Sequence, residues 1–540
     1  MEKNVLDLSN TLFPMKRKSN QNIWVKGVPI ILLSMVSIVL GTFVFDSKID
    51  MNGDNTSYYS LAKVLSQFKG YVNSFGNEMT PHSHFPPGYP FIIAPFMWIS
   101  KNLLFIKSLS TLFYISSVIL GFFVVLNFNR TKIIESLFIA LLLATNFHLL
   151  KYSTLIMSEI ALVVCNMIFL FLFLKNEAKW KDSILPDWKL ILLAFIGMLA
   201  FHIKTLAFPI IGAAFLFFLV RKKIKLAFGF LIWSFLFFLP YFLRNKIVGV
   251  GGGYLAELLK VNPYRPELGN LDLGGFLSRI ETNFYRYIGK EIPHGLLSFP
   301  EVNSNVFPPT SHLIAGFGIL FMILLGWNTL KGYRDFFLFY VVGTFTILLA
   351  WPEVWFGIRF MISLIPILLL LLGFGIIYLA QIISDYFQFN RSFLSVPIIG
   401  ILLALNFGWV QKNPLELPTI RFLRAYSKAD YPPAFKNYLE VAKWSKFNLP
   451  NSAPVACRKP GIFHMFYDGP ALGYPQVPDQ NEFIRLIEQN KTDYIVIDQL
   501  GYSSTARFVV PVVRDNPELF SIIYQTKKPE TYLVQYLGGN

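Results

Sequence analysis

The chain has 540 residues, of which 54% are hydrophobic and only 15% are charged, and its mean hydropathy is +0.49. A soluble domain could not expose so much apolar surface to water, so the composition excludes a soluble protein and indicates a membrane protein. The formal net charge is +16. The Lys and Arg residues cluster between apolar runs, where they act as topology signals, so we expect no nucleic-acid partner.

Long apolar runs recur along the chain, and each is about as long as one membrane-spanning helix requires. They predict an α-helical polytopic membrane protein with about 11 transmembrane helices. The predicted spans are residues 28–45, 105–128, 133–150, 158–174, 190–203, 206–220, 226–243, 312–330, 336–351, 358–382 and 394–410.

Basic segments lie on alternate connections between these runs, which is the pattern of cytoplasmic loops. In chain order they are KRK, NFNRTK, KNEAKWK, RKKIK, KGYR and the NR before Ser392. The sequence therefore predicts a multi-pass protein of the plasma (inner) membrane with a cytoplasmic N-terminus. No convincing cleavage site follows the first run, so we expect an uncleaved first helix. The principal outer segments are then a first outer loop at 46–104 and a large outer loop at 244–311.

Near its start the first outer loop contains GDNTSYY, in which Asp54 precedes a segment whose apolar spacing predicts an amphipathic helix. Asp54 stands at a capping position, and on spacing alone capping is the simpler interpretation. Further on, PHSHFPPGYP carries His82 and His84, which lack a third metal ligand at motif spacing. The run GYPFIIAPFMWI is short and broken by Pro, so it is predicted to lie in the membrane interface.

A second carboxylate and three cations are predicted at the same membrane face. Glu159 starts a span, where a carboxylate is costly unless it faces a cavity or a partner, although a first-turn acid is also favoured by the helix dipole. Arg244, Arg359 and Lys204 stand at the outer ends of other spans. An anionic ligand at headgroup depth or snorkelling to lipid phosphate would explain them. Together these charges suit transfer chemistry on a lipid phosphate.

The composition changes after about Asn413 to a mixture rich in Pro, Asn, Lys and Asp. There, NEFIRLIEQN predicts an amphipathic helix and DYIVID predicts a strand. We therefore expect residues 1–410 to form the transmembrane domain and residues 411–540 to form a small extracytoplasmic α/β domain.

Five motifs, in their order and topology, resemble those of the polytopic GT-C glycosyltransferases, in particular the branch that contains protein O-mannosyltransferases and lipid A aminoarabinose transferases. The motifs are GDNTSYY, FPPGYP, LIMSE, PYFLRN and RFMISLIP. The resemblance implies an inverting glycosyltransferase, a hexosyl- or pentosyltransferase, with a polyprenyl-phosphate-linked sugar as donor. The acceptor would be a hydroxyl of a glycan, lipid or protein at the outer face of the membrane.

The resemblance also implies roles for individual residues. Asp54 would be the catalytic base and Glu159 the second acid of the site. The cations and a histidine that would bind the donor phosphate are Arg244, Arg359, Lys204 and His84. The residues of the first outer loop expected near the substrate are Asn55, Tyr58, Tyr59 and Tyr89.

The chain departs from the family pattern at three positions. Many relatives have an Asp-Glu pair where this chain has Asp54-Asn55, and the aminoarabinose enzymes have Arg at the position of Ser57 and Lys at that of Phe85. The donor sugar therefore stays open. A transporter or flippase, a polymerase or ligase of lipid-linked saccharides, and a binding protein are the alternatives; transporters usually place their charges at mid-membrane. Mg or Mn could bind Asp54, Glu159 and His84, but two carboxylates favour a metal-free site.

Overall fold

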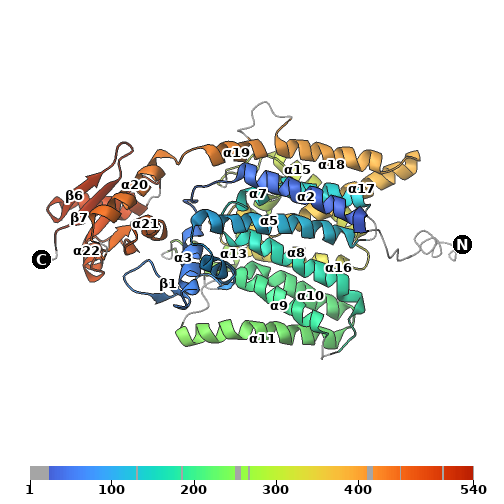
Figure 1. Ribbon diagram of the computed structural model, residues 1–540, viewed down its shortest axis with the longest axis horizontal. Helices are drawn as coiled ribbons and strands as arrows, with labels where there is room; N and C mark the ends of the chain where they lie inside the picture. Colours follow the sequence, from blue (N-terminus) through green and yellow to red (C-terminus); the bar gives the residue numbers. More distant parts are fainter. Residues whose placement is uncertain are drawn as a thin grey trace.

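The computed structural model describes residues 23–128, 132–183, 187–249, 257–265, 268–303, 305–409, 417–450, 452–501 and 504–538. Apolar helices lie side by side along the long axis of the molecule, and a smaller unit with a β-sheet lies at one end of them (Figure 1). The helix α3 (Asn55–Ser66) and the strand β1 (Val72–Asn73), from the segment predicted as the first outer loop, lie at that same end. We call this end of the helical bundle the sheet end.

Each of the eleven apolar runs coincides with a helix. The bundle helices are α2 (Ile23–Val44), α5 (Leu103–Leu126), α6 (Ile133–Thr145), α8 (Ser158–Asn176), α9 (Trp188–Ile203), α10 (Phe208–Val220), α11 (Ile224–Val248), α15 (Thr310–Thr329), α16 (Arg334–Ala350), α17 (Ile365–Phe387) and α18 (Ser392–Phe407). Within the described ranges, α2, α5, α8, α11, α15 and α17 are long and apolar enough to cross a membrane. The helices α6, α9, α10 and α18 are apolar but shorter.

The structure corrects three of the predicted helix ends. The run 133–150 is divided at Asn146, whose side chain accepts hydrogen bonds from His148 N and Leu149 N and so starts a separate helix, α7 (Phe147–Tyr152). The segment at Arg359 is a 3₁₀ turn, η6 (Ile358–Phe360), and α17 begins only at Ile365. Arg244 belongs to α11, which continues past it. Val410, the last residue of the final predicted span, lies outside the described residues.

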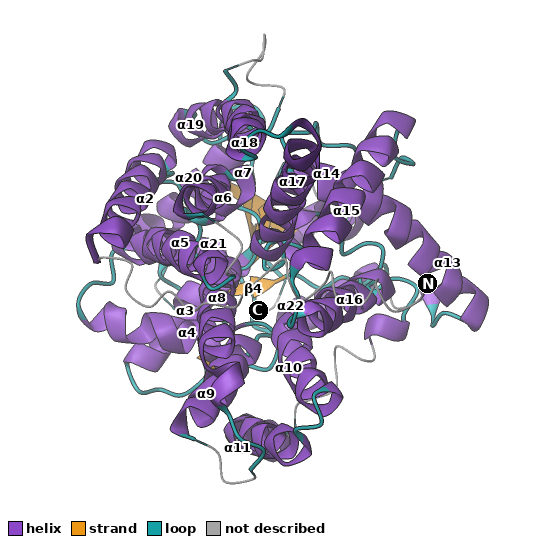
Figure 2. Ribbon diagram, turned by 90° about the vertical axis from the view of Figure 1, so that its right-hand side faces the viewer, coloured by secondary structure: helices purple, strands orange, loops and turns teal. Residues whose placement is uncertain are grey.

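Close helix packing holds the centre of the bundle. A Cβ atom at Gly326 would lie 1.8 Å from the Leu371 carbonyl oxygen, and one at Gly375 would lie 2.0 Å from that of Met322. Glycine at both positions therefore lets the backbones of α15 and α17 touch, which is the usual reason for small residues between membrane helices. Most residues of α8 and α17 are buried within the protein. Viewed along the bundle, α11 lies at its margin (Figure 2).

The first outer loop contains α3 (Asn55–Ser66), a hairpin of β1 (Val72–Asn73) and β2 (Thr80–Pro81), α4 (Gly88–Ile93) and the 3₁₀ helix η1 (Ala94–Trp98). The amphipathic helix predicted after Asp54 is α3. The run predicted to lie in the interface forms α4 and η1, which together are too short to cross a bilayer. The large outer loop contains α13 (Leu273–Arg286), a π-helical turn η5 (Tyr287–Glu291) and α14 (Ile292–Leu296).

A five-stranded sheet with the order β4-β3-β5-β7-β6 forms the core of the C-terminal unit. β3 is parallel to β4 and β5, whereas β7 is antiparallel to β5 and β6. The strands are β3 (Val455–Cys457), β4 (Ala471–Gly473), β5 (Tyr494–Ile497), β6 (Phe520–Gln525) and β7 (Tyr532–Tyr536). The helices of this unit are α20 (Pro433–Asn448), α21 (Pro460–Tyr467), α22 (Gln480–Gln489), η7 (Thr505–Val509), α23 (Val510–Asp515) and η8 (Pro517–Leu519). The preceding helix, α19 (Ile420–Lys428), packs on α2, α7 and α18 of the bundle. The predicted amphipathic helix is α22 and the predicted strand is β5.

Candidate functional site

Two carboxylates and two cations meet at the sheet end of the bundle. Arg359 donates through one terminal nitrogen to Asp54 Oδ2 and through Nε to Glu159 Oε1, the latter at 2.7 Å. Lys204 Nζ lies 2.8 Å from the same Glu159 oxygen. We call these four residues the bridged cluster. They come from four segments that are far apart in the sequence, and the fold brings together both predicted acids and two of the three predicted cations.

Asp54 reaches the cluster because its side chain does not cap the helix that follows it. It occupies the N-cap position of α3, yet it makes no side-chain capping hydrogen bond, and only its carbonyl accepts the first helical bond from Tyr58 N. Gly53 before it has a φ of +79°, in the left-handed region that favours glycine. The expectation that Asp54 caps α3 is therefore wrong, because its carboxylate is turned toward Arg359 instead.

Glu159 lies deepest in the cluster, with a side chain that is 1% exposed. Both cations bind Oε1, whereas Oε2 is buried and has no hydrogen-bond partner among the described residues. A buried carboxylate oxygen left without a donor is costly, so such groups in a folded protein call for an explanation. Stabilisation by the helix dipole would explain an acid in the first turn of α8. It does not explain why two cations contact Glu159.

Lys204 is placed by the break between two helices. It follows the last residue of α9 and precedes the 3₁₀ turn η3 (Thr205–Ala207), which leads into α10. Its ammonium group lies 5.3 Å from the centre of the Phe360 ring, so the residue next to Arg359 also packs against it. Lys204 therefore connects the α9–α10 corner with both Glu159 and the turn that carries Arg359.

The first-outer-loop residues that were expected near the substrate have side chains that contact other parts of the protein. The Tyr58 hydroxyl donates to Ser158 Oγ at 3.2 Å, and the Asn55 side chain accepts from Ile156 N at 3.0 Å. Burial, followed by the charges of Glu159 and Asp54, raises the pKa of Tyr58, so its hydroxyl stays protonated. Tyr89 is buried with its ring edge-on to Tyr58, at 5.0 Å, and Tyr59 donates to the Lys101 carbonyl. Asn55 and Tyr58 thus attach α3 to the start of α8.

The large outer loop holds the segment before Arg359. Asn283 Nδ2 donates to the carbonyls of Leu349 and Trp351, each at 2.8 Å, and Arg286 donates to that of Glu353 at 3.0 Å. Both side chains are buried. Neither residue was singled out from the sequence, because a lone Asn or Arg in a loop gives no sign of which distant backbone it will bind. Ser158 was also missed, although it adjoins Glu159 in the LIMSE motif.

The two other predicted phosphate ligands have different neighbours. Arg244 donates to the Tyr71 carbonyl at 3.0 Å and to Asn245 Oδ1 at 2.9 Å. His84 is exposed and its ring lies edge-on to Phe85, at 4.6 Å. Their hydrogen bonds and ring contacts thus lie on the first outer loop and on α11, whereas Lys204 and Arg359 contact the two acids directly.

His82, close to His84 in the sequence, is buried and has a defined tautomer. Its Nε2 accepts a hydrogen bond from Phe85 N at 2.9 Å, so its Nδ1 carries the proton and donates to Asn73 Oδ1 at 2.6 Å. Burial, followed by the neighbouring charges of His84 and Arg244, lowers the pKa of His82 to about 4. His82 therefore connects the hairpin to the FPPGYP segment as a neutral group.

The bridged cluster does not fit a divalent cation. Across the described parts of the chain, no three His, Cys, Asp or Glu side chains gather into a ligand set. The Arg359 guanidinium binds both carboxylates and would have to leave before one ion could bridge them. A hard cation also prefers more oxygen ligands than two carboxylates supply.

The arrangement of helices and sheet is shared with solved membrane glycosyltransferases. ArnT from Cupriavidus metallidurans, solved with undecaprenyl phosphate, matches 94% of this chain over 97% of its own length, with a TM-score of 0.57 and 11% identity. The oligosaccharyltransferase AglB from Archaeoglobus fulgidus, in complex with an inhibitory peptide and a dolichol-phosphate, matches 94% of this chain over 74% of its own, with a TM-score of 0.58 and 13% identity. The chain has the GT-C fold.

Sequence comparison adds nothing further, since no protein-family model and no curated protein matches the chain. The A. fulgidus oligosaccharyltransferase has also been solved with Zn and sulfate, and that structure matches 93% of this chain over 72% of its own, with a TM-score of 0.58 and 14% identity. At these identities the likeness establishes the fold. The fold, together with its long apolar helices, makes the chain a membrane protein.

Proposed function

We propose that this protein is a membrane glycosyltransferase that moves a sugar from a polyprenyl-phosphate-linked donor to an acceptor hydroxyl. The observation that carries the proposal is the bridged cluster, in which Arg359 binds both Asp54 and Glu159 beside Lys204. The cluster lies where the apolar helices end, so in the membrane orientation that we propose its charges would be at a depth that a lipid phosphate can reach. The GT-C fold supports the same class of reaction, because the similar proteins are solved with undecaprenyl phosphate or a dolichol-phosphate.

Lys204 and Arg359 would bind the donor phosphate. A guanidinium has five N–H donors and an ammonium has three, and the contacts to the carboxylates use two of the former and one of the latter. The remaining donors can bind phosphate oxygens and stabilise the negative charge that develops as the phosphate leaves. Glu159 acts through these cations, because it holds both in place from the buried side.

Asp54 would be the general base. Arg359 binds its Oδ2, so Oδ1 is the oxygen that can accept the proton of an acceptor hydroxyl. The hydroxyl oxygen attacks the anomeric carbon, the bond from that carbon to the phosphate oxygen breaks, and the electron pair leaves with the polyprenyl phosphate. A single displacement of this kind inverts the anomeric centre. The acceptor would be a hydroxyl of a glycan, a lipid or a protein.

The topology proposed from the basic loops fits this reaction. We infer that the N-terminus is cytoplasmic, that the protein lies in the plasma (inner) membrane, and that the sheet end faces the outside. The transmembrane part would then comprise residues 1–410 and the external α/β domain residues 411–540. The C-terminal unit contacts the first outer loop, since Ala471 N donates to the Phe75 carbonyl at 2.7 Å and Asn77 to that of Asn490 at 3.0 Å.

Mass analysis of lipids in vesicles tests the proposal directly. Vesicles with the purified protein are supplied with a polyprenyl-phosphate-sugar extract and an envelope acceptor extract, and matched vesicles lack the protein. We expect one donor lipid to be converted to polyprenyl phosphate, with a product heavier by the same sugar. Movement of intact donor across the bilayer without loss of its sugar would contradict the transferase and support a flippase. A product extended by several units would instead indicate a polymerase.

A further inference from the structure

A second charged site lies where α2 meets α19, apart from the bridged cluster. It is a pocket of about 660 Å³ lined by residues of the α2 end, the start of the first outer loop and the α19 end. These residues are Thr42, Phe45, Ser47, Lys48, Arg424, Ser427, Lys428, Ala429 and Asp430. We propose that this pocket binds the phosphate headgroup of an anionic glycerophospholipid from the membrane leaflet at the sheet end.

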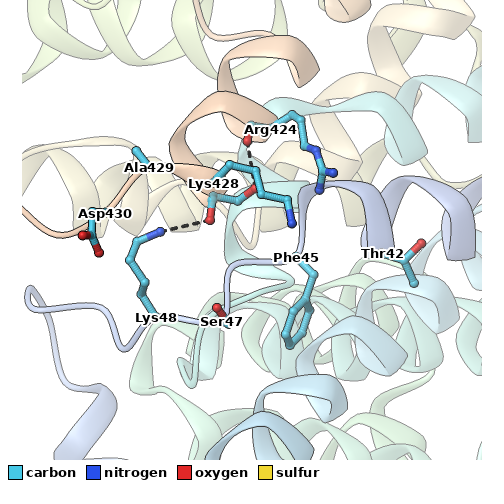
Figure 3. Close-up of a pocket in the computed structure, with 9 residues that line it drawn as sticks. Thr42, Phe45, Ser47, Lys48, Arg424, Lys428, Ala429 and Asp430 are labelled. Carbon is cyan, nitrogen blue, oxygen red and sulfur yellow. Dashed lines mark hydrogen bonds between the residues drawn. The ribbon is translucent and has the colours of Figure 1, made fainter.

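The charge of the pocket favours an anion. Three cations and one acid line it, which gives a formal charge of +2, and the acid, Asp430, is paired with Lys436 at 3.1 Å. Figure 3 shows the charged ends of Arg424 and Lys428 on the same side of α19, toward Thr42 of α2 and Phe45, the residue that follows α2. The Ser47 hydroxyl can add a hydrogen bond to a phosphate oxygen, whereas the hydroxyls of Thr42 and Ser427 already donate to backbone carbonyls.

The cations are held in place by the backbone around them. Arg424 donates to the Phe43 carbonyl at 2.7 Å and its guanidinium lies 4.8 Å from the centre of the Phe43 ring. Lys48 Nζ donates to the carbonyls of Tyr426 and Ser427, at 3.2 and 3.1 Å, and also pairs with Asp46 at 2.9 Å. Lys428 is exposed at the end of α19. Two cations are thus positioned beforehand, which lowers the entropy cost of binding.

A stripe of apolar side chains on α2 leads to the pocket. The acyl chains of the lipid would contact this stripe. The exposed large side chains of α2 recur at a helical spacing, which places them along one face of the helix. They are Val28, Ile31, Leu32, Met35, Ile38, Val39 and Phe43. Thr42 continues this face into the pocket, since its hydroxyl donates to the Ile38 carbonyl at 2.8 Å. Acyl chains along α2 would therefore bring a phosphate to Arg424 and Lys428, whereas a free anion would gain nothing from this stripe.

A lipid bound here would act on the first outer loop and on the C-terminal unit together. Lys48 belongs to the loop but binds α19, and the neighbouring Ile49 N donates to the Tyr431 hydroxyl at 2.8 Å. Below the pocket, the buried Lys107 of α5 donates to the Lys48 carbonyl. A phosphate bound by Arg424 and Lys428 would tighten this junction, which Lys48 already holds through its three N–H donors and which lies a few residues before Asp54.

Lipid binding can be measured without any enzyme assay. The full chain, purified in mild detergent, is titrated with phosphatidylglycerol and separately with phosphatidylcholine, and native mass spectrometry counts the bound lipids. Each surface cation contributes about 5-fold to the affinity for an anionic lipid. The double variant Arg424→Gln, Lys428→Gln should therefore bind phosphatidylglycerol about 25-fold more weakly, with phosphatidylcholine binding unchanged. Lys428→Gln alone, at an exposed side chain, should lose about 5-fold without a change in folding.

Arg421→Gln is the matched control, because Arg421 is exposed on the same helix but does not line the pocket. Equal affinity for phosphatidylglycerol in the double variant and in this control would overturn the proposal. Competition by inorganic phosphate distinguishes a lipid headgroup from a free phosphate ion as the ligand of this pocket. If inorganic phosphate displaces the lipid at a matching concentration, the site binds a free anion and the lipid assignment is wrong; if it does not, the lipid assignment stands.

Discussion

Two buried carboxylates, one near each end of the bundle, are bound by arginine in opposite ways. Glu135, at the start of α6, is fully buried and binds Arg391 through both oxygens, each at 2.9 Å, while Oε2 also accepts from Lys132 N at 3.0 Å. Glu159 is equally buried, yet one oxygen takes both cations and the other has no partner within the described residues. The first carboxylate is saturated and the second is not.

The difference separates a carboxylate that stabilises the fold from one that, in the function we propose, serves a reaction. A bidentate pair with a third hydrogen bond meets every requirement of the carboxylate and fastens two connections of the chain together. The bridged cluster instead leaves donors on Lys204 and Arg359, an oxygen on Glu159, and a second acid held only through Arg359. An incompletely satisfied network costs stability, and such costs are typical of functional sites.

The comparison predicts its largest effect at Asp54. Asp54→Asn should lower sugar transfer by about 10²- to 10⁴-fold, because an amide cannot take the acceptor proton. The amide oxygen can still accept from Arg359, so expression and thermal stability should stay near those of the parent protein. Transfer is measured in vesicles with donor lipid. Asp50→Asn, at the other acid of this segment, is the matched control, and near-normal transfer by Asp54→Asn would contradict the role of base.

Arg359 should show the next largest effect. Arg359→Lys keeps the charge but cannot bind Asp54 and Glu159 at once, since an ammonium lacks the planar fork of a guanidinium. We expect transfer to fall by about 10²-fold, as when one preorganised donor to a developing charge is lost. Arg244→Lys is the control. A comparable loss in that variant would show that Arg244 also binds the donor, as the sequence suggests.

Glu135→Gln tests the carboxylate whose hydrogen bonds are saturated. Loss of the charged hydrogen bonds to Arg391 should lower the free energy of unfolding by about 2 kcal/mol, measured by denaturation in detergent. Transfer per folded molecule should not change, because the pair only fastens the fold. Glu518→Gln, on an exposed side chain, should change stability by less than about 0.5 kcal/mol. A catalytic defect in folded Glu135→Gln protein would contradict a purely structural role of the pair with Arg391.

The smallest predicted effect is a pH dependence from the first outer loop. Since the pKa of His82 is lowered to about 4, the unfolded chain binds a proton more readily than the folded one between that pH and the ordinary value near 6.5. Stability should therefore fall as the pH falls through this window, by about 1 kcal/mol between pH 7 and 5.5. The free energy of unfolding is measured against pH for the parent and for His82→Gln, which isolates this contribution because the other histidines contribute to both proteins. Identical slopes of the unfolding free energy against pH would contradict the prediction.

The sequence predicted the elements of the fold well, because each depends on local periodicity. Eleven apolar runs coincide with eleven helices, and the helix and strand predicted near the C-terminus are α22 and β5. Helix ends were less well predicted. A helix end can depend on a single residue, as at Asn146, which caps α7 and so ends the straight run before it.

The sequence by itself determined that this is a polytopic membrane protein and which charges stand at the ends of its helices, because apolar length and charge placement are properties of the chain. Only the tertiary structure decided which of these charges meet. It joins Asp54, Glu159, Lys204 and Arg359, and it gives Arg244 and His84 other neighbours. It also shows that Asp54 binds Arg359 and leaves its helix uncapped. The physical reason is that an ion pair depends on distances between segments far apart in sequence, which no local pattern records.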